Sequence, residues 1–331
     1  MKLTTKKQIL AILPFALRRF ALKIWFFVSN PRLLLVIFSK FKSLKKTVLI
    51  ISTPRCGSSW LGSILGAADT ARYLREPITS SYMQSFSDVP SFFTSKKCKK
   101  WETYSGFANN AFKPSLNFSR SVITYPKQWL DYTTAKTTVI KEVNPLVLKY
   151  YLTRFSPQVI YLVRHPFSVA KSSSRLGWIN EDMFSRRFSQ SQLQQILRKQ
   201  PDLLAQNYWF QSGYLQGLIA VQTQELLKKY DDSINVCYEE LCQFPIEQFE
   251  KIFSFTGFDF SKRIKNKLTH SHNGKKPIET GDFSLVRDKN KVGKIVVDES
   301  EQDNYKQLMA AYKLAWAHYD INDSLGDLYC G

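Results

Sequence analysis

The sequence predicts an α/β fold, a three-layer domain in which a mostly parallel β-sheet is flanked by helices. Short apolar runs bounded by turn residues are typical of buried strands, and helical patterns separate these runs along the chain. Strands that alternate with helices favour a parallel sheet, because each parallel connection needs a crossover. The predicted strands are residues 47–52, 137–142, 158–164 and 234–240.

Helices are expected between and after these strands. Pro145, Pro166 and Pro201 each stand where a helix can begin, a position that tolerates the missing backbone N–H of proline. The predicted helices are residues 59–67, 145–155, 166–175, about 202–229, 245–256 and 301–318.

The length and composition indicate one large domain with appendages. The chain has 331 residues, of which 44% are hydrophobic, enough for a sizeable core. We expect a single domain over residues 47–331, preceded by a basic, apolar helical arm over residues 1–46. Residues 77–135 are rich in Ser, Phe, Tyr and Asn without a clear period, which indicates an insertion beside the sheet, a natural place for ligand recognition. Residues 268–298 are irregular and contain many Lys residues, which indicates a basic loop.

The positive charge of the chain is concentrated in the arm. The formal net charge is +20, and residues 1–46 contain eleven Lys and Arg residues but no Asp or Glu, which leaves +9 for the rest. Charged residues interrupt the apolar runs of the arm, so neither a membrane-spanning helix nor a signal peptide is expected. Two interpretations of residues 1–46 stay open: a helix on an anionic membrane surface, and an arm packed on the domain.

The cysteines favour a reducing compartment. The five Cys residues are irregularly spaced and form no CxxC pair, so neither a disulfide framework nor a zinc site is indicated. His270 and His272 have no carboxylate or Cys at ligand spacing, and we expect no metal. The expected location is cytoplasmic, with peripheral contact at the cytoplasmic face of a membrane if the arm binds lipid.

The stretch TVLIISTPRCGSSWLGSIL, residues 47–65, contains a candidate anion site between a strand and a helix. The N-terminus of a helix offers unpaired N–H groups and partial positive charge, and Arg55 adds a planar set of donors that suits phosphate or sulfate oxygens. The GxxxxGK[ST] pattern of a nucleoside-triphosphate loop is absent, because the basic residue precedes Gly57. The alternative is an ordinary turn in which Ser58 or Ser59 caps the helix.

A second motif makes the anion site more specific. In YLVRHPFSVAKSSSR, Ser172 follows Arg164 by eight residues, and Pro166 opens the predicted helix between them. TPRCGSSWL resembles the 5′-phosphosulfate loop of sulfotransferases that use 3′-phosphoadenosine 5′-phosphosulfate (PAPS), and the Arg–Ser pair is similar to their 3′-phosphate site. The resemblance runs from about residue 47 to 320 and implies the P-loop NTPase-like sulfotransferase fold.

The resemblance implies a transferase that moves the sulfuryl group of PAPS to a hydroxyl by direct in-line transfer, without a metal. Arg55 rather than Lys stands in the first loop, Glu76 precedes a Pro, and no His lies between the two motifs. In these features the chain resembles the carbohydrate sulfotransferase branch, so the implied acceptor is a carbohydrate or glycolipid. The implied PAPS-binding residues are Arg55, Cys56, Gly57, Ser58, Ser59, Trp60, Arg164 and Ser172.

Two carboxylates compete for the role of general base, the group that removes the proton of the acceptor hydroxyl. Glu76 is the candidate, with surface pairing to a neighbouring Arg as the alternative. Glu142 closes a predicted strand and is the competitor. Arg55 is expected to stabilise the leaving phosphate oxygen, with Lys141 either assisting it or balancing Glu142.

Some residues depart from the family pattern or admit a plainer interpretation. Cys56 replaces a more usual Ser and donates weakly. His165, where Asp or Asn is common, either caps the following helix or adds positive charge. Trp60 and Trp178 follow the two motifs and either stack on a ligand ring or pack in the core.

Two other classes of function remain as alternatives. A P-loop-type kinase would share the fold but needs a lysine after Gly57, which the loop lacks. A non-enzymatic protein that binds membranes or nucleic acid would explain residues 1–46 but not the paired motifs. Because most of the basicity lies in the arm, no specific nucleic-acid partner is expected.

Overall fold

The computed structural model describes most of the region in which the fold was predicted. It places residues 46–85, 99–112, 137–179, 182–273 and 294–319, together with the four arm positions Leu17, Phe20, Ala21 and Ile24.

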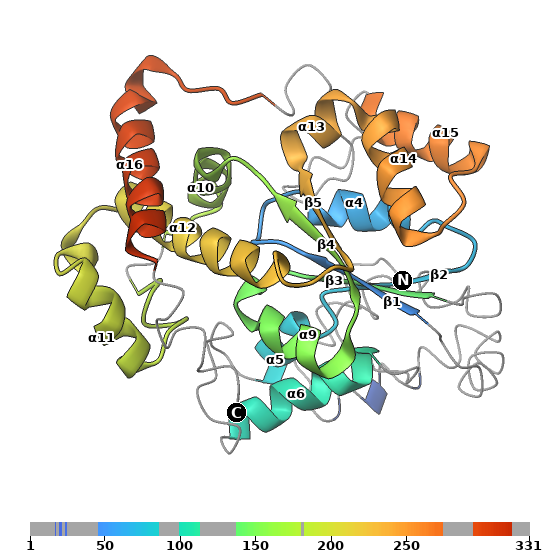
Figure 1. Ribbon diagram of the computed structural model, residues 1–331, viewed down its shortest axis with the longest axis horizontal. Helices are drawn as coiled ribbons and strands as arrows, with labels where there is room; N and C mark the ends of the chain where they lie inside the picture. Colours follow the sequence, from blue (N-terminus) through green and yellow to red (C-terminus); the bar gives the residue numbers. More distant parts are fainter. Residues whose placement is uncertain are drawn as a thin grey trace.

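The centre of the domain is a five-stranded sheet in which every neighbouring pair is parallel, in the order β2-β3-β1-β4-β5 (Figure 1). The predicted three-layer, mostly parallel α/β fold is therefore confirmed. The strands are β1 (Lys46–Ile51), β2 (Ala71–Arg75), β3 (Thr137–Glu142), β4 (Gln158–Val163) and β5 (Ser233–Cys237).

One strand, β2, was not expected from the sequence. Its sequence, ARYLR, is short and contains two arginines, so it does not read as an apolar run. In the structure Arg72 is nonetheless only 1% exposed, and Tyr73 and Leu74 are buried as well. The strand pairs with β3 along its whole length, from Ala71 opposite Thr137 to Arg75 opposite Lys141. This pairing brings Glu76, the next residue, to the carboxyl edge of the sheet.

Alternation along the strands separates two apolar layers. Val48, Ile50 and Val139 belong to a cluster with Trp60 and Leu61 of the helix that follows the candidate anion loop. The helices on this side are α4 (Ser58–Leu65), α13 (Tyr238–Gln243), α14 (Pro245–Thr256) and α15 (Lys262–Asn273), drawn above the sheet in Figure 1.

The opposite face of the sheet is covered by aromatic-rich helices. Leu49 and Ile140 pack there in a cluster with Trp101, Tyr104 and Tyr151. The helices are α5 (Thr79–Ser85), α6 (Lys99–Phe112), the short η1 (Pro145–Val147) and α9 (Leu148–Phe155). Helices α5 and α6 fall within the predicted insertion 77–135, whose remaining residues lie outside the described part.

A third group of helices packs beside β4 and β5, to the left in Figure 1. Helix α12 crosses α16 so closely that only glycine fits at positions 213 and 217. A Cβ at Gly213 would lie 2.1 Å from the Leu308 carbonyl oxygen. The group consists of α10 (Pro166–Ser174), α11 (Gln190–Lys199), η2 (Leu203–Ala205), α12 (Tyr208–Leu227), η3 (Glu299–Glu301) and α16 (Gln302–His318).

The predicted helices agree with the structure except at some boundaries. Helix α14 has the predicted bounds, and the predicted helix 202–229 consists of η2 followed by α12. The predicted strand 234–240 is too long, because the chain turns into α13 at Tyr238. Helices α11, α13 and α15 were not predicted as separate elements.

The arm and the basic loop lie mostly outside the described residues. Of residues 1–46, only the four arm positions and Lys46 are described, and of the predicted loop 268–298, residues 274–293 are not. Within the described part of the chain, no helix combines the length and the hydropathy needed to cross a bilayer.

The α12–α16 crossing predicts a large effect of Gly213→Ala. The added methyl group would meet the Leu308 carbonyl and force two packed helices apart, at a cost of about 1–3 kcal/mol in the free energy of unfolding. Urea denaturation of the purified protein measures this loss.

Gly106→Ala in α6 is the matched control, because a Cβ there meets nothing within 4 Å. The control should be neutral or stabilising by up to about 1 kcal/mol, the helix-propensity difference between Ala and Gly. Equal destabilisation by both substitutions would contradict the close crossing.

Candidate functional site

The predicted anion loop connects β1 to α4 at the carboxyl edge of the sheet. Two of its residues have left-handed backbone conformations, Arg55 at φ 72° and Gly57 at φ 89°. Glycine is required at the second position for a further reason, because a Cβ on Gly57 would lie 2.3 Å from a ring carbon of Tyr238. The backbone of the loop is therefore packed directly on the aromatic side chain that follows β5.

Helix α4 begins without a side-chain cap. The N-cap residue is Gly57, and neither Ser58 nor Ser59 caps the helix, so the alternative of a serine-capped turn is wrong. Ser58 is buried, and its hydroxyl oxygen accepts a hydrogen bond of 2.9 Å from Ser52. The first N–H groups of a helix have no partners within it, so α4 presents its N-terminal donors and partial positive charge at this loop.

Three of the predicted ligand residues meet in space. The Arg55 Nε atom donates to Ser172 Oγ at 3.0 Å, and the Arg164 Nη1 atom donates to the Arg55 carbonyl oxygen at 2.8 Å. Arg164 also stacks over the Tyr238 ring, with its Cζ atom 4.7 Å from the centroid. The two motifs, 109 residues apart at the two arginines, thus form one cationic cluster beside α4.

An exposed tryptophan borders this cluster. Trp178 is 43% exposed, and the Cζ atom of Arg55 lies 5.9 Å from its ring centroid. Its backbone N–H donates to the Ser173 carbonyl oxygen at 3.0 Å, after the left-handed Gly177 that follows helix α10. Of the two interpretations of Trp178, core packing is wrong.

Trp60 and Cys56, by contrast, turn their side chains into the core. Trp60 is fully buried, lies edge-on to Phe249 at 5.4 Å, and donates its indole N–H to Ser271 at 2.9 Å. Stacking of the Trp60 ring on a ligand is therefore corrected to core packing. Cys56 is 2% exposed and contacts Thr53 Oγ1 at 3.0 Å. Burial raises the pKa of its thiol, although the Thr53 contact opposes this, so only its backbone is available to a ligand.

His165 occupies the N-cap position of α10, but its side chain does not cap the helix and adds little positive charge. Its side chain makes no capping bond, and its ring stacks on Tyr305 at 5.9 Å. The backbone N–H of His165 donates instead to Glu239 at 3.1 Å. Burial lowers the pKa of the imidazole, partly offset by Glu239, which favours the neutral form. Both predicted roles of His165 are therefore corrected.

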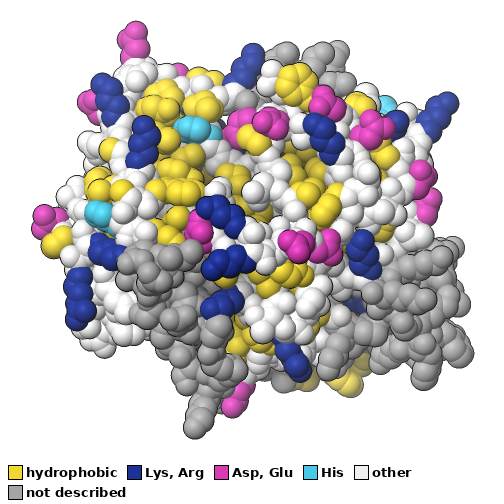
Figure 2. Space-filling model, in the orientation of Figure 1, with side chains coloured by type: hydrophobic (Ala, Val, Ile, Leu, Met, Phe, Trp, Pro, Cys, Tyr) yellow, Lys and Arg dark blue, Asp and Glu magenta, His cyan; other side chains and the backbone are white. Residues whose placement is uncertain are grey.

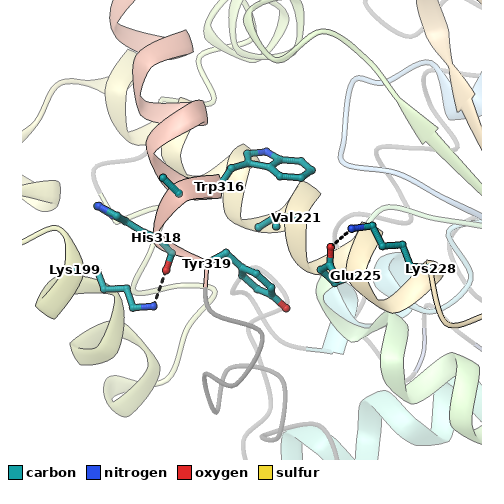
Figure 3. Close-up of a pocket in the computed structure, with 8 residues that line it drawn as sticks. Lys199, Val221, Glu225, Lys228, Trp316, His318 and Tyr319 are labelled. Atoms are coloured by element: carbon teal, nitrogen blue, oxygen red, sulfur yellow. Dashed lines mark hydrogen bonds and ion pairs between the residues drawn. The ribbon is translucent and has the colours of Figure 1, made fainter.

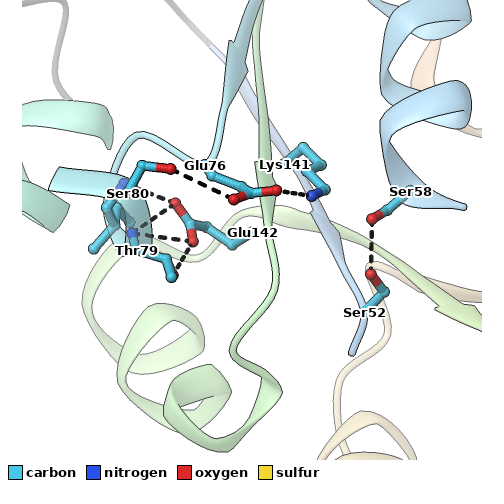
Figure 4. Close-up of polar contacts among 8 residues, drawn as sticks. Ser52, Ser58, Glu76, Thr79, Ser80, Lys141 and Glu142 are labelled. Carbon is cyan, nitrogen blue, oxygen red and sulfur yellow. Dashed lines mark hydrogen bonds and ion pairs between the residues drawn. The ribbon is translucent and has the colours of Figure 1, made fainter. Parts of the chain in front are cut away.

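Glu76 lies at the carboxyl end of β2 and forms an ion pair with Lys141 of β3 (Figure 4). Its backbone N–H donates to the Lys141 carbonyl oxygen at 2.6 Å, which continues the β2–β3 ladder by one residue. The Glu76 side chain is 26% exposed, whereas Lys141 is 3% exposed. The predicted alternative, a surface Glu paired with a neighbouring Arg, is replaced by pairing with this buried lysine.

The ion pair sets the charge of Glu76. Burial acts to raise the pKa of its carboxyl, but the Lys141 ammonium, Arg75 and the hydrogen bond from Ser80 together outweigh burial, and the pKa is lowered below its ordinary value. Glu76 is therefore ionised at neutral pH, which is the state that a general base requires.

Glu142, the competing base, is fully buried on the other side of the same strand. Its carboxylate accepts hydrogen bonds from the backbone N–H of Ile78 at 2.7 Å and from the Thr79 hydroxyl at 2.5 Å. Burial raises the pKa of Glu142 to about 7, against the opposing effect of these hydrogen bonds. Both carboxylate oxygens of Glu142 already accept hydrogen bonds, and its side chain is not exposed to solvent. Glu142 is therefore a poor candidate for contact with an acceptor.

Sheet geometry places Glu76 opposite the anion loop. Lys141 shares a face of β3 with Val139, in the layer of α4, whereas Glu142 shares the opposite face with Ile140. Strand β3 lies between β1 and β2, so the loop after β1 and the turn after β2 are roughly 10 Å apart, two strand spacings. The Lys141–Glu76 pair therefore lies at the same edge of the sheet as the cationic cluster.

An open pocket lies away from the predicted site, between the ends of α11, α12 and α16 (Figure 3). It is lined by Lys199, Glu225, Trp316 and His318 among others, and none of the predicted site residues contributes to it. Across the part of the chain that the structure describes, no group of three or more His, Cys, Asp or Glu residues could hold a metal ion. The expectation of metal-free chemistry remains a prediction.

One residue of the site, Tyr238, and one pairing, between Lys141 and Glu76, were not expected from the sequence. Tyr238 touches both predicted loops, but it was expected inside the predicted strand 234–240 and not at a ligand site. The pairing of Lys141 with Glu76 required knowledge of β2, which the sequence did not reveal.

Comparisons with known proteins agree with the family resemblance. A family model described as "Sulfotransferase domain" matches residues 45–278, more than half of the chain. No curated protein matches the sequence at a significant level.

Several solved structures are similar at low sequence identity. A sulfotransferase domain from the Synechococcus PCC 7002 olefin synthase is 17% identical, with 85% of this chain and 97% of that chain covered and a TM-score of 0.43. Sulfotransferase STF9 from Mycobacterium avium is 12% identical (89% and 81% covered, TM-score 0.44). Mouse sulfotransferase SULT7A1 complexed with PAP is 15% identical (91% and 93% covered, TM-score 0.44). The family assignment rests on the sequence match alone.

The Lys141–Glu76 pair predicts that replacement of Lys141 changes the pH dependence of stability. In the wild-type protein the lowered pKa of Glu76 contributes stability above about pH 4.5, which is lost as the pH falls through the pKa of the folded state. In Lys141→Met only Arg75 and the Ser80 hydrogen bond oppose burial, so the pKa of Glu76 rises and its contribution to stability at neutral pH becomes smaller. Urea midpoints between pH 4 and pH 8 measure both slopes.

Lys251→Met is the control, because Lys251 forms an exposed pair with Glu247 within α14. It should leave both the unfolding free energy and the slope nearly unaltered, because exposed ion pairs contribute little to stability. The same slope in Lys141→Met and wild type would contradict the dominance of the ion pair.

Proposed function

This chain belongs to the sulfotransferase family, and we propose that it transfers the sulfuryl group of PAPS directly to a hydroxyl group of a carbohydrate or glycolipid. Its enzymatic class, a transferase of sulfuryl groups, follows from the family match over residues 45–278. The observation that carries the assignment of the site is the meeting of Arg55, Arg164 and Ser172 beside the N-terminus of α4.

The donor set of this cluster fits a nucleotide with two anionic ends. Arg55 and the first N–H groups of α4 suit the phosphosulfate, because both offer donors to oxygen atoms of one anion. Arg164 and Ser172 stand on the next strand and its helix and suit the second phosphate. Hydrogen bonds already join the three side chains to one another or to the loop backbone, so their positions are set before a ligand arrives.

The chemistry requires a base on one side and cations on the other. Glu76 removes the proton of the acceptor hydroxyl, and the acceptor oxygen forms a bond to sulfur as the bond from sulfur to the phosphate oxygen breaks. Arg55 stabilises the negative charge on the departing phosphate oxygen, and Lys141 stabilises charge on the sulfuryl oxygens. The products are the sulfated acceptor and adenosine 3′,5′-bisphosphate (PAP), and the proton remains on Glu76.

The proposed acceptor class is supported by the aromatic edge of the site. Trp178 exposes 43% of its surface next to Arg55, so a flat ring is available to a ligand beside the cationic cluster. Such a ring packs against the apolar face of a sugar while hydroxyl groups at the sugar's edge reach the polar residues. The sequence features that resemble the carbohydrate branch support the same class.

The arm supports a proposal about location, namely that this cytoplasmic protein contacts anionic membranes peripherally. The four described arm residues are helical, and Leu17, Phe20 and Ile24 expose 54%, 62% and 48% of their surfaces. Their spacing of three and four residues forms one apolar stripe, within a segment that carries eleven Lys and Arg residues. On the domain face of Figure 2, by contrast, basic and acidic side chains are interspersed.

Glu76→Gln and Arg55→Ala test the reaction. PAPS with radioactive sulfur is incubated with para-nitrophenyl glycosides of glucose, galactose and N-acetylglucosamine and with galactosylceramide. Glu76→Gln should bind PAP normally in calorimetry but lose at least about 100-fold in turnover, because the proton acceptor is gone. Arg55→Ala should weaken PAP binding by about tenfold or more, since a charge-assisted contact is removed.

Arg198→Ala is the control for lost positive charge, because this arginine is exposed on α11. It should leave binding and turnover unchanged. Full turnover by Glu76→Gln would exclude Glu76 as the base, and failure of the wild-type protein to bind PAP would exclude the proposed donor.

Replacement of the apolar stripe tests the membrane contact. The triple variant Leu17→Ser, Phe20→Ser, Ile24→Ser should sediment about tenfold less with phosphatidylserine vesicles than the wild-type protein, because the buried apolar area is lost. PAP binding should be the same in both proteins. Equal sedimentation of the two proteins, or no wild-type binding to anionic vesicles, would contradict the proposal.

A further inference from the structure

The turn that carries Glu76 adopts a conformation that needs support from its surroundings. Glu76 has φ 50°, in the left-handed region that is uncommon for residues other than glycine. Pro77 follows immediately and restricts the backbone of Glu76 further. Such a conformation persists only where neighbouring contacts over-determine it.

Glu142 supplies most of the contacts that hold this turn. One carboxylate oxygen accepts the backbone N–H of Ile78 at 2.7 Å, and the other accepts the Thr79 hydroxyl at 2.5 Å (Figure 4). The backbone N–H of Thr79 lies 3.3 and 3.4 Å from the two oxygens. Four donor–acceptor contacts from two consecutive residues thus converge on one buried side chain.

The same turn also orients the Glu76 carboxylate. Ser80, the residue after Thr79, donates its backbone N–H to the Glu76 carbonyl at 3.0 Å and its hydroxyl to Glu76 Oε2 at 3.4 Å. Lys141 pairs with the other carboxylate oxygen of Glu76. Both oxygens of Glu76 are therefore oriented, one by the turn and one by β3.

The main chain of Glu142 connects the same residue to the donor side. Its carbonyl oxygen accepts the backbone N–H of Ser52 at 3.3 Å, where the anion loop begins. A single residue of β3 therefore contacts the first residue of the donor loop through its backbone and the Glu76 turn through its side chain.

We propose that Glu142 is a positioning residue, whose ionised carboxylate holds the Glu76–Thr79 turn and so fixes the catalytic base relative to the donor loop. This inference rests on the proposed function, because it presumes that Glu76 is the base. It gives Glu142, which was a competing candidate for the base itself, a role that needs no contact with the acceptor.

The surroundings of Glu142 make its charge sensitive to pH near neutrality. Burial raises its pKa to about 7, and the negative charge of Glu76 adds to this effect, whereas Thr79, Ile78 and Lys141 oppose it. From the other packed elements, the hydroxyls of Tyr104 on α6 and Tyr151 on α9 face the carboxyl; they bond to each other at 2.6 Å, and the pKa of each is raised. The protonated carboxyl would lose part of its capacity to accept hydrogen bonds from the turn.

Activity and stability should therefore respond to pH in opposite directions. The pKa of Glu142 in the folded state lies above its ordinary value, so its contribution to stability is full below about pH 4.5 and is lost as the pH rises through about 7. The ionised form that positions Glu76 is thus the less stable form of the protein. Glu76 cannot produce this pH dependence, because its own pKa is lowered.

The experiment measures kcat and the urea midpoint of the same proteins between pH 6 and pH 8, with saturating PAPS and the neutral para-nitrophenyl glycoside that is the best acceptor. In the wild-type enzyme kcat should rise about tenfold over this interval, as the ionised fraction of a group with a pKa near 7 does. Glu142→Gln should have a kcat about 10–100-fold lower, because the turn is misplaced, and no rise with pH. Its PAP affinity should remain that of wild type.

Two threonine variants provide a matched comparison. Thr79→Val and Thr223→Val each remove the hydroxyl of a buried threonine, but Thr223 bonds to Ile219 within α12 and does not touch the site. Thr79→Val should lower kcat about tenfold and Thr79→Ser should restore it. Thr223→Val should destabilise the protein without changing the pH profile of kcat.

Each outcome decides the matter in one direction. A rise of kcat with pH in Glu142→Gln equal to that in wild type, or an equal kcat in Thr79→Val and wild type, would overturn the positioning role while leaving sulfuryl transfer intact. A pH dependence confined to the urea midpoint would assign Glu142 a structural role alone. Failure of the wild-type protein to transfer sulfur to any acceptor would overturn the proposed function and this inference together.

Discussion

The position of β3 between β1 and β2 is the constraint on which the rest of the site depends. Parallel pairing on both sides brings the ends of three strands to one edge, so the anion loop after β1 and the Glu76 turn after β2 flank the last residues of β3. Lys141 and Glu142, adjacent in sequence, point to opposite faces because of strand alternation. Lys141 lies on the side of α4 and pairs with Glu76, whereas Glu142 lies on the side of the aromatic helices and accepts the hydrogen bonds of the Glu76 turn.

Much of this arrangement was accessible from the sequence. Apolar runs predicted four of the five strands, and the spacing of Arg164 and Ser172 predicted a second anion-binding segment that the structure brings to Arg55. Strand β2 could not be predicted from the sequence, because Arg72 and Arg75 interrupt its apolar pattern. Its burial depends on the elements packed around it. Without β2 the partner of Lys141 remained ambiguous, and the roles of Glu76 and Glu142 could not be separated. Whether Trp60 and Trp178 are buried or exposed likewise depends on tertiary packing.

Buried charge accompanies the functional edge. Lys141 and Glu142 are almost completely removed from solvent, which is unfavourable unless hydrogen bonds and opposite charges compensate. The compensation differs between them: Lys141 has an ionic partner, whereas Glu142 has neutral donors. The buried charges of Lys141 and Glu142 lower the stability of the fold at the edge where side chains must be precisely oriented. Such a loss of stability is a common property of active sites.

The ring of Tyr238 limits how this enzyme can change. It lies against Gly57 of the anion loop and under the guanidinium of Arg164, so one aromatic side chain forms a wall shared by both segments. A larger residue in the loop would need a smaller residue at position 238, and that change would also remove the support of Arg164. Engineering of donor specificity at one end of the nucleotide is therefore coupled to the other end, and libraries that vary these three positions together have a better prospect than stepwise substitution.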